Sequence, residues 1–334
     1  MINTMKIMLI SDKLTASSLE YEGSYLSYLK CNFIANHILK LSSDCLLVES
    51  AWNGYKDSWK FKIASYPDHP NRTNEKLVRL VEKAKAKGIP TVFWNKEDGV
   101  HFERFIDSAK HFDHIFTVDQ NCVERYRAVV PASTTVDVAM FPVQPRLHNY
   151  QGFRFKHFEA NFVGSYSRHI HDKRRERQEM LFSAALKAGL PVNIFDRNSE
   201  RKSDNYRYPT QFDLNVRPSV SYAQTADIYR DYLISLNVNT VEDSPTMFSR
   251  RVVEVLACGG ILVSTPSLAV NSLFKEYCHI VHNEDEAIEL FQRLKFGPSK
   301  KDLEMAKAGA DFVLNNFTWQ HFLQKIYQKI QSKR

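Results

Sequence analysis

The chain has 334 residues, of which 43% are hydrophobic, and a formal net charge of +7 at pH 7. This length is enough for two globular domains of about 150 residues each. The first residues do not resemble a signal peptide, and no apolar run approaches the roughly 18 residues that span a bilayer. We therefore expect a cytoplasmic protein whose membrane contact, if any, is peripheral. None of the five cysteines is paired at metal-ligand spacing, so buried reduced thiols are expected.

The positive charge restricts the class of partner. An excess of Lys and Arg is typical of proteins that bind nucleic acid, an anionic membrane surface or a phosphorylated substrate. The densest basic run, Arg168–Arg177, also contains acidic residues, and a solvated, ion-paired helix face explains most of it. Long Lys tails and the interleaved aromatic and basic residues of RNA-binding modules are absent. Nucleic acid is therefore the least favoured of these partners.

Strand-like and helix-like segments alternate in the first half of the chain. Strands are predicted at 6–10, 45–48, 91–94, 114–118 and 136–140, and helices at 25–41 and 73–87. The apolar stripe of the second helix runs from Leu77 to Ala84, and Gly88 then ends the helix. Strands that are separated by helices of this length indicate βαβ units and a parallel sheet.

A second alternating series follows a linker-like stretch between Pro142 and Gly152. Strands are predicted at 160–163, 192–195, 232–238, 261–263 and 279–281, a helix at 172–187, and three closing helices, the last of which Thr318 caps. Residues 198–222 look irregular. The sequence thus predicts an α/β protein with two Rossmann-like domains, whose parallel sheets face each other across a cleft.

The most informative stretch is Ser244–Gly260, which predicts a polar loop, a short helix and a glycine stop. Arg250, Arg251 and Glu254 are spaced to share one helix face. A helix N-terminus attracts phosphate, arginine forks bind pyrophosphate, and a carboxylate one turn later can accept ribose hydroxyl groups. This combination indicates a nucleotide-activated substrate. Alternatively, Arg250 and Glu254 form a surface ion pair and Cys258–Gly260 is an ordinary helix end.

Ligands of open parallel sheets bind beyond the carboxyl ends of the strands. This rule selects the polar residues that follow the predicted strands. In the first half they are 11–12, 95–98 and 119–120, and in the second half 164–166, 196–197, 237–243 and 264–265.

Several motifs resemble, in the same order, those of the CgeB-like (spore-maturation-type) glycosyltransferases. They are Phe93–Phe102, His114–Asp119, Asn161–Tyr166, Leu236–Thr240 and Ser244–Arg251. The resemblance runs from about residue 90 to about residue 320 and implies the GT-B architecture. It implies an N-terminal acceptor domain at 1–147, a C-terminal nucleotide-sugar domain at 155–317, and a closing helix at 318–334 that packs back on the first domain.

The resemblance also assigns roles to single positions. Glu254 matches the carboxylate that retaining GT-B enzymes often use on the donor ribose. Many of these enzymes have another Glu eight residues earlier, where this chain has Thr246. The glycine-rich loop common after their first strand is replaced by Ser11–Leu14.

The predicted function is glycosyl transfer from a nucleotide sugar to a hydroxyl group of a glycan, a glycolipid or another glycoconjugate. No Asp-x-Asp pair stands out, and Glu242–Asp243 looks like a solvated loop pair, so transfer without metal or cofactor is expected. The donor is expected to contact Gly164, Ser165, Asp196, Arg197, Asn237, Asn239, Ser244, Ser249, Arg250, Arg251 and Glu254. A GT-B-fold nucleotide-sugar epimerase, a nucleic-acid-modifying protein and a non-catalytic nucleotide-binding module are the alternatives.

The candidates for the general base are Glu97, Asp98 and His101, because they follow a predicted strand end. The alternative for Asp98 is to cap a helix that starts near Gly99. Asp119 could likewise cap the helix after it, and Asp196 could form a local ion pair with Arg197.

Overall fold

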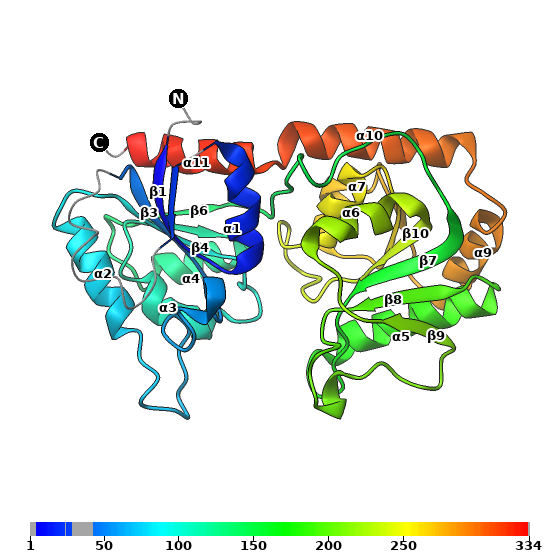
Figure 1. Cartoon of the computed structure of the whole chain (residues 1–334), viewed down its shortest axis with the longest axis horizontal. Coiled ribbons are helices and arrows are strands. Elements are labelled where there is room, and N and C mark those ends of the chain that lie inside the picture. Colours follow the sequence, from blue (N-terminus) through cyan, green and yellow to red (C-terminus); the bar gives the residue numbers. More distant parts are fainter. Residues whose placement is uncertain (1–4, 24, 29–42, 333–334) are drawn as a thin grey trace. The chain divides into compact units, whose positions relative to one another are not determined.

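The structure is a computed structural model that describes residues 5–23, 25–28 and 43–332 (Figure 1). The chain forms two units. Unit 1 consists of Met1–Pro142, Pro245–Met247 and Trp319–Arg334, and unit 2 consists of Val143–Ser244 and Phe248–Thr318. Among the described helices, none has both the length and the apolar character that a membrane crossing requires.

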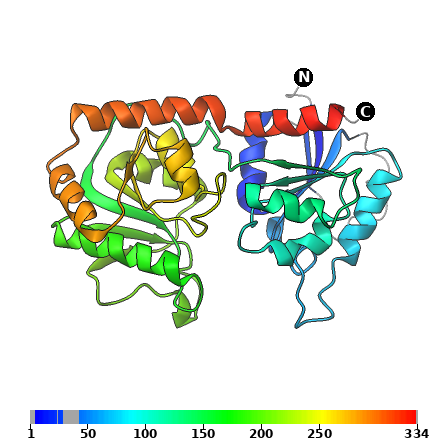
Figure 2. The same cartoon turned by 180° about the vertical axis from the view of Figure 1, so that it is seen from behind.

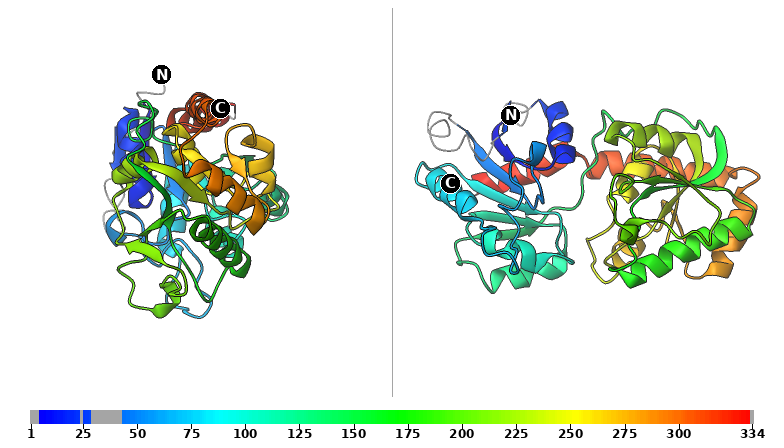
Figure 3. Two further views of the ribbon diagram at one scale, coloured as in Figure 1. Left: turned by 90° about the vertical axis from the view of Figure 1, so that its right-hand side faces the viewer. Right: turned by 60° about the horizontal axis from the view of Figure 1, so that its bottom comes forward.

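Unit 1 is a parallel sheet with helices on both faces. Its elements are β1 (Lys6–Ile10), α1 (Lys13–Leu19), β2 (Tyr25–Tyr28), β3 (Cys45–Glu49), α2 (Glu75–Lys85), β4 (Thr91–Asn95), α3 (Phe102–Ala109), β5 (His114–Thr117), α4 (Val123–Arg127), β6 (Thr135–Val138) and α11 (Trp319–Gln331). The strand order is β2-β1-β3-β4-β5-β6. Helices α2, α3 and α4 cover one face, and α1 and α11 cover the other (Figures 1 and 3).

Alternate residues of each strand face opposite sides of the sheet, so both faces are apolar. Phe93 belongs to the core cluster that also contains the buried residues of α2 and α3. Trp94 lies on the other face, where its ring centroid is 5.6 Å from that of Trp319 and 4.7 Å from that of Phe322. Its indole N–H donates to the carbonyl of Ala139 at 3.0 Å. The last helix therefore supplies part of the core of unit 1.

Unit 2 repeats the plan with a second parallel sheet. Its elements are β7 (His157–Gly164), α5 (Asp172–Lys187), β8 (Val192–Asp196), β9 (Leu214–Arg217), α6 (Tyr222–Asp231), β10 (Tyr232–Asn237), α7 (Arg251–Ala257), β11 (Ile261–Ser264), α8 (Leu268–Leu273), β12 (His279–Ile280), α9 (Glu284–Leu294) and α10 (Lys300–Asn316). The strand order is β12-β11-β10-β7-β8-β9. Helices α5 and α9 lie on one face, and α6, α7 and α10 on the other (Figures 1 and 2).

Two sequence predictions are corrected at the sheet edges. The helix predicted over 25–41 is wrong at its start, because Tyr25–Tyr28 forms the edge strand β2, paired with β1; residues 29–41 lie outside the described residues. The segment 198–222 is not wholly irregular, since Leu214–Arg217 forms the edge strand β9, paired with β8. Residues 215–217 of this strand are exposed, so it lacks the apolar run that marks the inner strands.

Gly259 ends α7 under two constraints. Its φ of +72° lies in the left-handed region that favours glycine. A Cβ at this position would also lie 2.5 Å from Cδ2 of the Tyr150 ring. Gly189, which follows α5 in the same unit, has φ +75°, but its nearest neighbour is the flexible Lys295 ammonium group at 3.6 Å.

We expect Gly259→Ala to lower the free energy of unfolding by about 2–4 kcal/mol, because backbone strain and overpacking add. Gly189→Ala carries the strain alone and should cost about 1–2 kcal/mol. Denaturant unfolding of both variants measures the difference. Equal losses in the two variants would show that the Tyr150 ring moves aside at no cost.

Candidate functional site

Arg251, the first residue of α7, extends across the carboxyl ends of β7 and β10. Its Nε and Nη2 donate to the carbonyl of Val163 at 2.9 and 2.6 Å, and Nη1 donates to Oδ1 of Asn237 at 3.0 Å. The guanidinium carbon lies 4.2 Å from the centroid of the Phe162 ring. A guanidinium group has five N–H donors, so these three bonds anchor Arg251 and leave donor capacity for a ligand.

Gly164 makes room for this arginine. A Cβ added to Gly164 would lie 2.7 Å from Nη2 of Arg251 and 2.4 Å from Cε1 of Phe162. Gly164 is among the residues expected to contact the donor. In the structure, the group that approaches it is the guanidinium of Arg251.

Two more arginines lie near Arg251. Arg174 of α5 donates from Nη2 to the carbonyl of Ser165 at 3.1 Å. Burial, together with the positive charge of Arg251, lowers the pKa of Arg174 to about 10. The charge of Arg197, which is exposed just after β8, lowers the pKa of both Arg174 and Arg251. Within the described residues, none of these three arginines has a carboxylate within 4 Å, and the negative charge that acts on Arg251 from farther away is that of Glu254.

Arg174 was not among the predicted donor residues. Its neighbours in the basic run form ion pairs, as predicted for a solvated helix face. Arg175 pairs with Asp172, and Arg177 and Lys173 both pair with Glu242. The spacing along α5 does not distinguish Arg174 from them. Glu242 is thus an ion-paired residue of unit 2.

Glu254 lies one turn along α7 from Arg250 and is 6% exposed, which excludes the surface ion pair considered from the sequence. Its Oε2 is 3.4 Å from the hydroxyl oxygen of Tyr229. Burial raises the pKa of Glu254, and the charge of the half-buried Arg250 opposes that shift.

The asparagines after β10 differ in how their side chains are used. Asn237, the last residue of β10, uses both ends of its amide, because its Oδ1 accepts from Arg251 and its Nδ2 donates to Oγ of Ser264 at 2.9 Å. Asn239 accepts from the backbone N–H of Ser249 at 2.9 Å, whereas its buried Nδ2 has no partner among the described residues. A buried amide donor without a partner is costly, and a ligand oxygen would satisfy it.

The other predicted donor residues lie at the same edge of the sheet. Ser244 is fully buried, and Ser165 is half-buried with its carbonyl bonded to Arg174. Asp196 accepts from the backbone N–H of Asn198 at 2.8 Å and has no ion pair with Arg197, so that alternative is wrong. Burial raises the pKa of Asp196.

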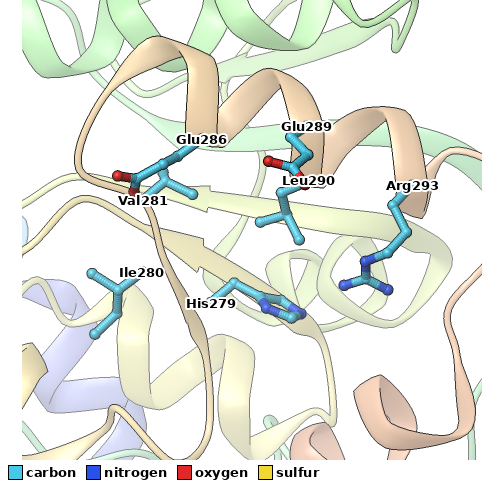
Figure 4. A pocket seen from close by; sticks show the side chains of 7 residues that line it. All are labelled: His279, Ile280, Val281, Glu286, Glu289, Leu290 and Arg293. Carbon is cyan, nitrogen blue, oxygen red and sulfur yellow. The ribbon is translucent and has the colours of Figure 1, made fainter.

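A cavity of about 350 Å³ in unit 2 lies between the edge strand β12 and α9 (Figure 4). Its polar side chains largely bond within the protein. Arg293 forms two bonds to Asp302, at 2.6 and 3.0 Å, and Glu286 accepts from the backbone N–H of His282. It contains none of the predicted donor residues. It is lined by His279, Ile280, Val281, Glu286, Glu289, Leu290 and Arg293.

In unit 1, the three candidate bases follow β4 but differ in access. Glu97 and His101 are half-buried. Burial lowers the pKa of His101, and the negative charge of Glu97 acts in the opposite direction. The ring of His101 packs edge-on against Trp52, with centroids 5.1 Å apart. The side chains of Glu97 and His101 are therefore accessible enough to contact a ligand.

Asp98 is fully buried and cannot reach an acceptor in this structure. Its carboxyl oxygens lie 3.1 and 2.9 Å from the hydroxyl oxygen of Tyr126, and Nδ2 of Asn95 donates to Oδ1 at 2.6 Å. Burial raises its pKa to about 7. It does not cap the following helix either, because α3 begins only at Phe102. Asp119, in contrast, does cap its helical turn, by accepting from the N–H of Asn121.

A charged network at the ends of β1, β3 and β4 was not predicted. Nζ of Lys96 lies 3.0 Å from Oε1 of the buried Glu49 and 3.2 Å from Oδ2 of Asp12. The acidic partners come from strands that are neighbours in the sheet but distant in the sequence. No single sequence motif therefore indicated this charged network.

Comparisons with known proteins agree with this geometry. Residues 174–328 match a family model described as glycosyl transferase-like. Among the curated proteins, none matches the chain in sequence.

Solved structures share the fold of both units. Anabaena Alr3699/HepE in complex with UDP has a TM-score of 0.59 at 12% identity, covering 98% of this chain and 100% of that one. A glycosyltransferase from Rickettsia africae ESF-5 has a TM-score of 0.54 at 12% identity, covering 98% and 99%. TarM has a TM-score of 0.52 at 10% identity, covering 90% of this chain, which spans 57% of the length of TarM. The predicted GT-B fold is confirmed, and the family match supports the predicted enzyme class, a glycosyltransferase.

The burial of Asp98 predicts how the free energy of unfolding depends on pH. Its pKa rises from 3.8 to about 7 on folding, so between these values the folded state holds a proton that the unfolded state has lost. The free energy of unfolding therefore falls as pH rises from about 4 to about 7. Asp98→Asn should remove about 1–3 kcal/mol of this fall and keep transfer activity within about tenfold of the parent.

Denaturant unfolding of parent and variant between pH 4.5 and 8 measures this effect. Asp107→Asn, at an exposed position of α3, is the control. Parallel pH curves for the parent and Asp98→Asn would contradict the assignment.

Proposed function

We propose that the protein transfers a sugar from a nucleoside diphosphate sugar to a hydroxyl acceptor, and that unit 2 binds the donor. The observation that carries this proposal is the group of arginines around Arg251, which has no carboxylate partner within 4 Å in the described residues. Partly buried cations with no carboxylate in ion-pair contact favour an anionic ligand. The HepE structures with UDP and with UDP-glucose support a uridine nucleotide as the first donor to test.

In this proposal, Arg251 acts chiefly on the leaving group. Negative charge builds on the pyrophosphate as the bond to the sugar breaks, and guanidinium donors stabilise that charge more strongly in the transition state than in the bound donor. Arg174 and Arg197 add positive potential at the same edge. Because these cations can stabilise the leaving group, we propose transfer that needs no metal.

Glu254 is proposed to hold the donor ribose. Its carboxylate can accept hydrogen bonds from ribose hydroxyl groups. Ribose contacts change little during the reaction, so this residue should affect binding more than turnover.

For the acceptor, we propose unit 1, with Glu97 as the general base and His101 beside it. The resemblance to CgeB-like enzymes supports a glycan or lipid-linked acceptor. The net charge of +7 supports peripheral contact with an anionic membrane. The described cysteines, Cys45, Cys122, Cys258 and Cys278, are free and buried, which supports a cytoplasmic location.

Arg251→Ala should bind UDP about tenfold more weakly and lower turnover by about 10²–10³-fold, because a charged donor to the leaving group is lost. Arg251→Lys keeps the positive charge but lacks the forked guanidinium donors, so it should restore part of the lost UDP affinity and turnover. Arg197→Ala removes an exposed side chain, so it should weaken UDP binding without changing the melting temperature.

Calorimetric titration with UDP and transfer assays with UDP-sugars measure these effects. Arg79→Ala, at an exposed position of α2, is the matched control. If Arg251→Ala and Arg197→Ala both bind UDP as tightly as the parent, the arginine group does not hold the donor.

Glu97→Gln should lower turnover by about 10²–10⁴-fold, the usual range for loss of a general base, with little change in donor affinity. Glu103→Gln, on the exposed side of α3, is the control. Near-normal turnover of Glu97→Gln would show that another residue is the general base.

A further inference from the structure

Two tyrosines of α6 lie next to Glu254, the residue that is proposed to hold the donor ribose. Tyr222 begins α6 and Tyr229 follows about two helical turns later, so the two side chains share one face of the helix. Tyr229 is 1% exposed, and its hydroxyl group donates to Oε2 of Glu254 at 3.4 Å. All three residues belong to unit 2, so this arrangement is complete within one unit.

The hydroxyl group of Tyr222 is buried and has no hydrogen-bond partner among the described residues. Burial and the negative charge of Glu254 raise the pKa of Tyr222 well above its usual value, so this hydroxyl is a neutral donor near a carboxylate. A buried donor without an acceptor is unfavourable, and the carboxylate of Glu254 is an acceptor that satisfies it. Burial raises the pKa of Glu254, whereas the charge of Arg250 and the nearby Tyr222 hydroxyl lower it.

His148 packs against Tyr222 and restricts the position of its ring. The two ring centroids are 4.8 Å apart. Nε2 of His148 lies 2.8 Å from Oγ1 of Thr225, whose own proton goes to the carbonyl of Tyr222 at 2.7 Å. Nε2 of His148 therefore carries the proton and donates to Thr225. Burial lowers the pKa of His148 to about 3, so its ring is neutral and does not attract the carboxylate of Glu254 away from the tyrosines.

We propose that Tyr222 and Tyr229 are positioning residues, whose hydroxyl groups hold the carboxylate of Glu254 ionised and oriented for the donor ribose. This inference rests on the proposed function. A carboxylate has two oxygens with about four lone-pair sites, so donors on the α6 side leave sites for the ribose hydroxyl groups. Two fixed phenolic donors also restrict the rotamers of Glu254 before the nucleotide binds, which lowers the cost of ordering it.

The test compares UDP with 2′-deoxy-UDP, which lacks one ribose hydroxyl group but shares the base and the diphosphate. The parent should bind 2′-deoxy-UDP about 10–30-fold more weakly than UDP, because a hydrogen bond to a charged group is lost. In Tyr222→Phe and in Tyr229→Phe, this ratio of Kd values should fall to about 2–5-fold, with little change in the Kd for 2′-deoxy-UDP. A substitution that only damaged the fold would weaken the binding of both nucleotides alike.

Calorimetric titration of the full chain measures these Kd values. Glu254→Gln should remove most of the ratio, and Tyr229→Phe in that background should change it little further, because both substitutions act on one interaction. Tyr232→Phe is the matched control. Tyr232 is another buried tyrosine of unit 2, but it lies at the amino end of β10, so this variant should keep the parental ratio.

The inference is overturned if Tyr222→Phe and Tyr229→Phe both keep the parental ratio, a result that leaves the donor role of Glu254 intact. A parent that binds the two nucleotides equally overturns the ribose role of Glu254 and this inference with it. A parent that binds no UDP contradicts the proposed donor, and the denaturant midpoints of the parent, the two single variants Tyr229→Phe and Glu254→Gln and their double variant then decide without a ligand. Additive changes overturn the hold on Glu254, whereas an effect of Tyr229→Phe that disappears in the Glu254→Gln background supports it.

Discussion

The guanidinium group of Arg251 joins three elements of unit 2 at the edge where its parallel strands end. It bonds the end of β7 through Val163 and the end of β10 through Asn237, and α7 begins at Arg251 itself. The adjacent position must be glycine, since any side chain on Gly164 would enter the space of this group. A single buried cation thus constrains two strand ends, one helix start and one glycine.

Such an arrangement is unfavourable without a ligand. Burial and the positive charge of Arg197 lower the pKa of Arg251, the charge of Glu254 opposes that shift, and the described residues supply no carboxylate within 4 Å of Arg174, Arg197 or Arg251. Like charges gathered in partly buried positions reduce folding stability unless an anion neutralises them. Natural proteins keep such clusters mainly where function needs them. Because an anionic ligand of this kind binds the folded state, it raises the free energy of unfolding with the logarithm of its concentration relative to its Kd.

The sequence predicted the inner strands well because they are buried on both faces and therefore appear as continuous apolar runs. The helix at 172–187 was found at its observed bounds. Edge strands were missed, since the exposed β9 has no apolar run and β2 has spacing that also suits a helix. Of the site, Arg251 could be located from its loop and helix context. The burial of Asp98, the inward position of Arg174 and the Lys96–Glu49 pair depend on long-range packing, which local spacing does not encode.

Unit 1 is discontinuous in the sequence, and this has a consequence for how the protein is made. Its first segment leaves the ribosome early, yet the face of the sheet that carries Trp94 receives Trp319 and Phe322 only when the last helix has been synthesised. Most of unit 2 is complete before that moment. Domains usually fold from the N-terminus onward during synthesis. In unit 1, the part of this face around Trp94 stays without its α11 contacts until Trp319 and Phe322 have been synthesised, so unit 1 completes its core after most of unit 2 exists.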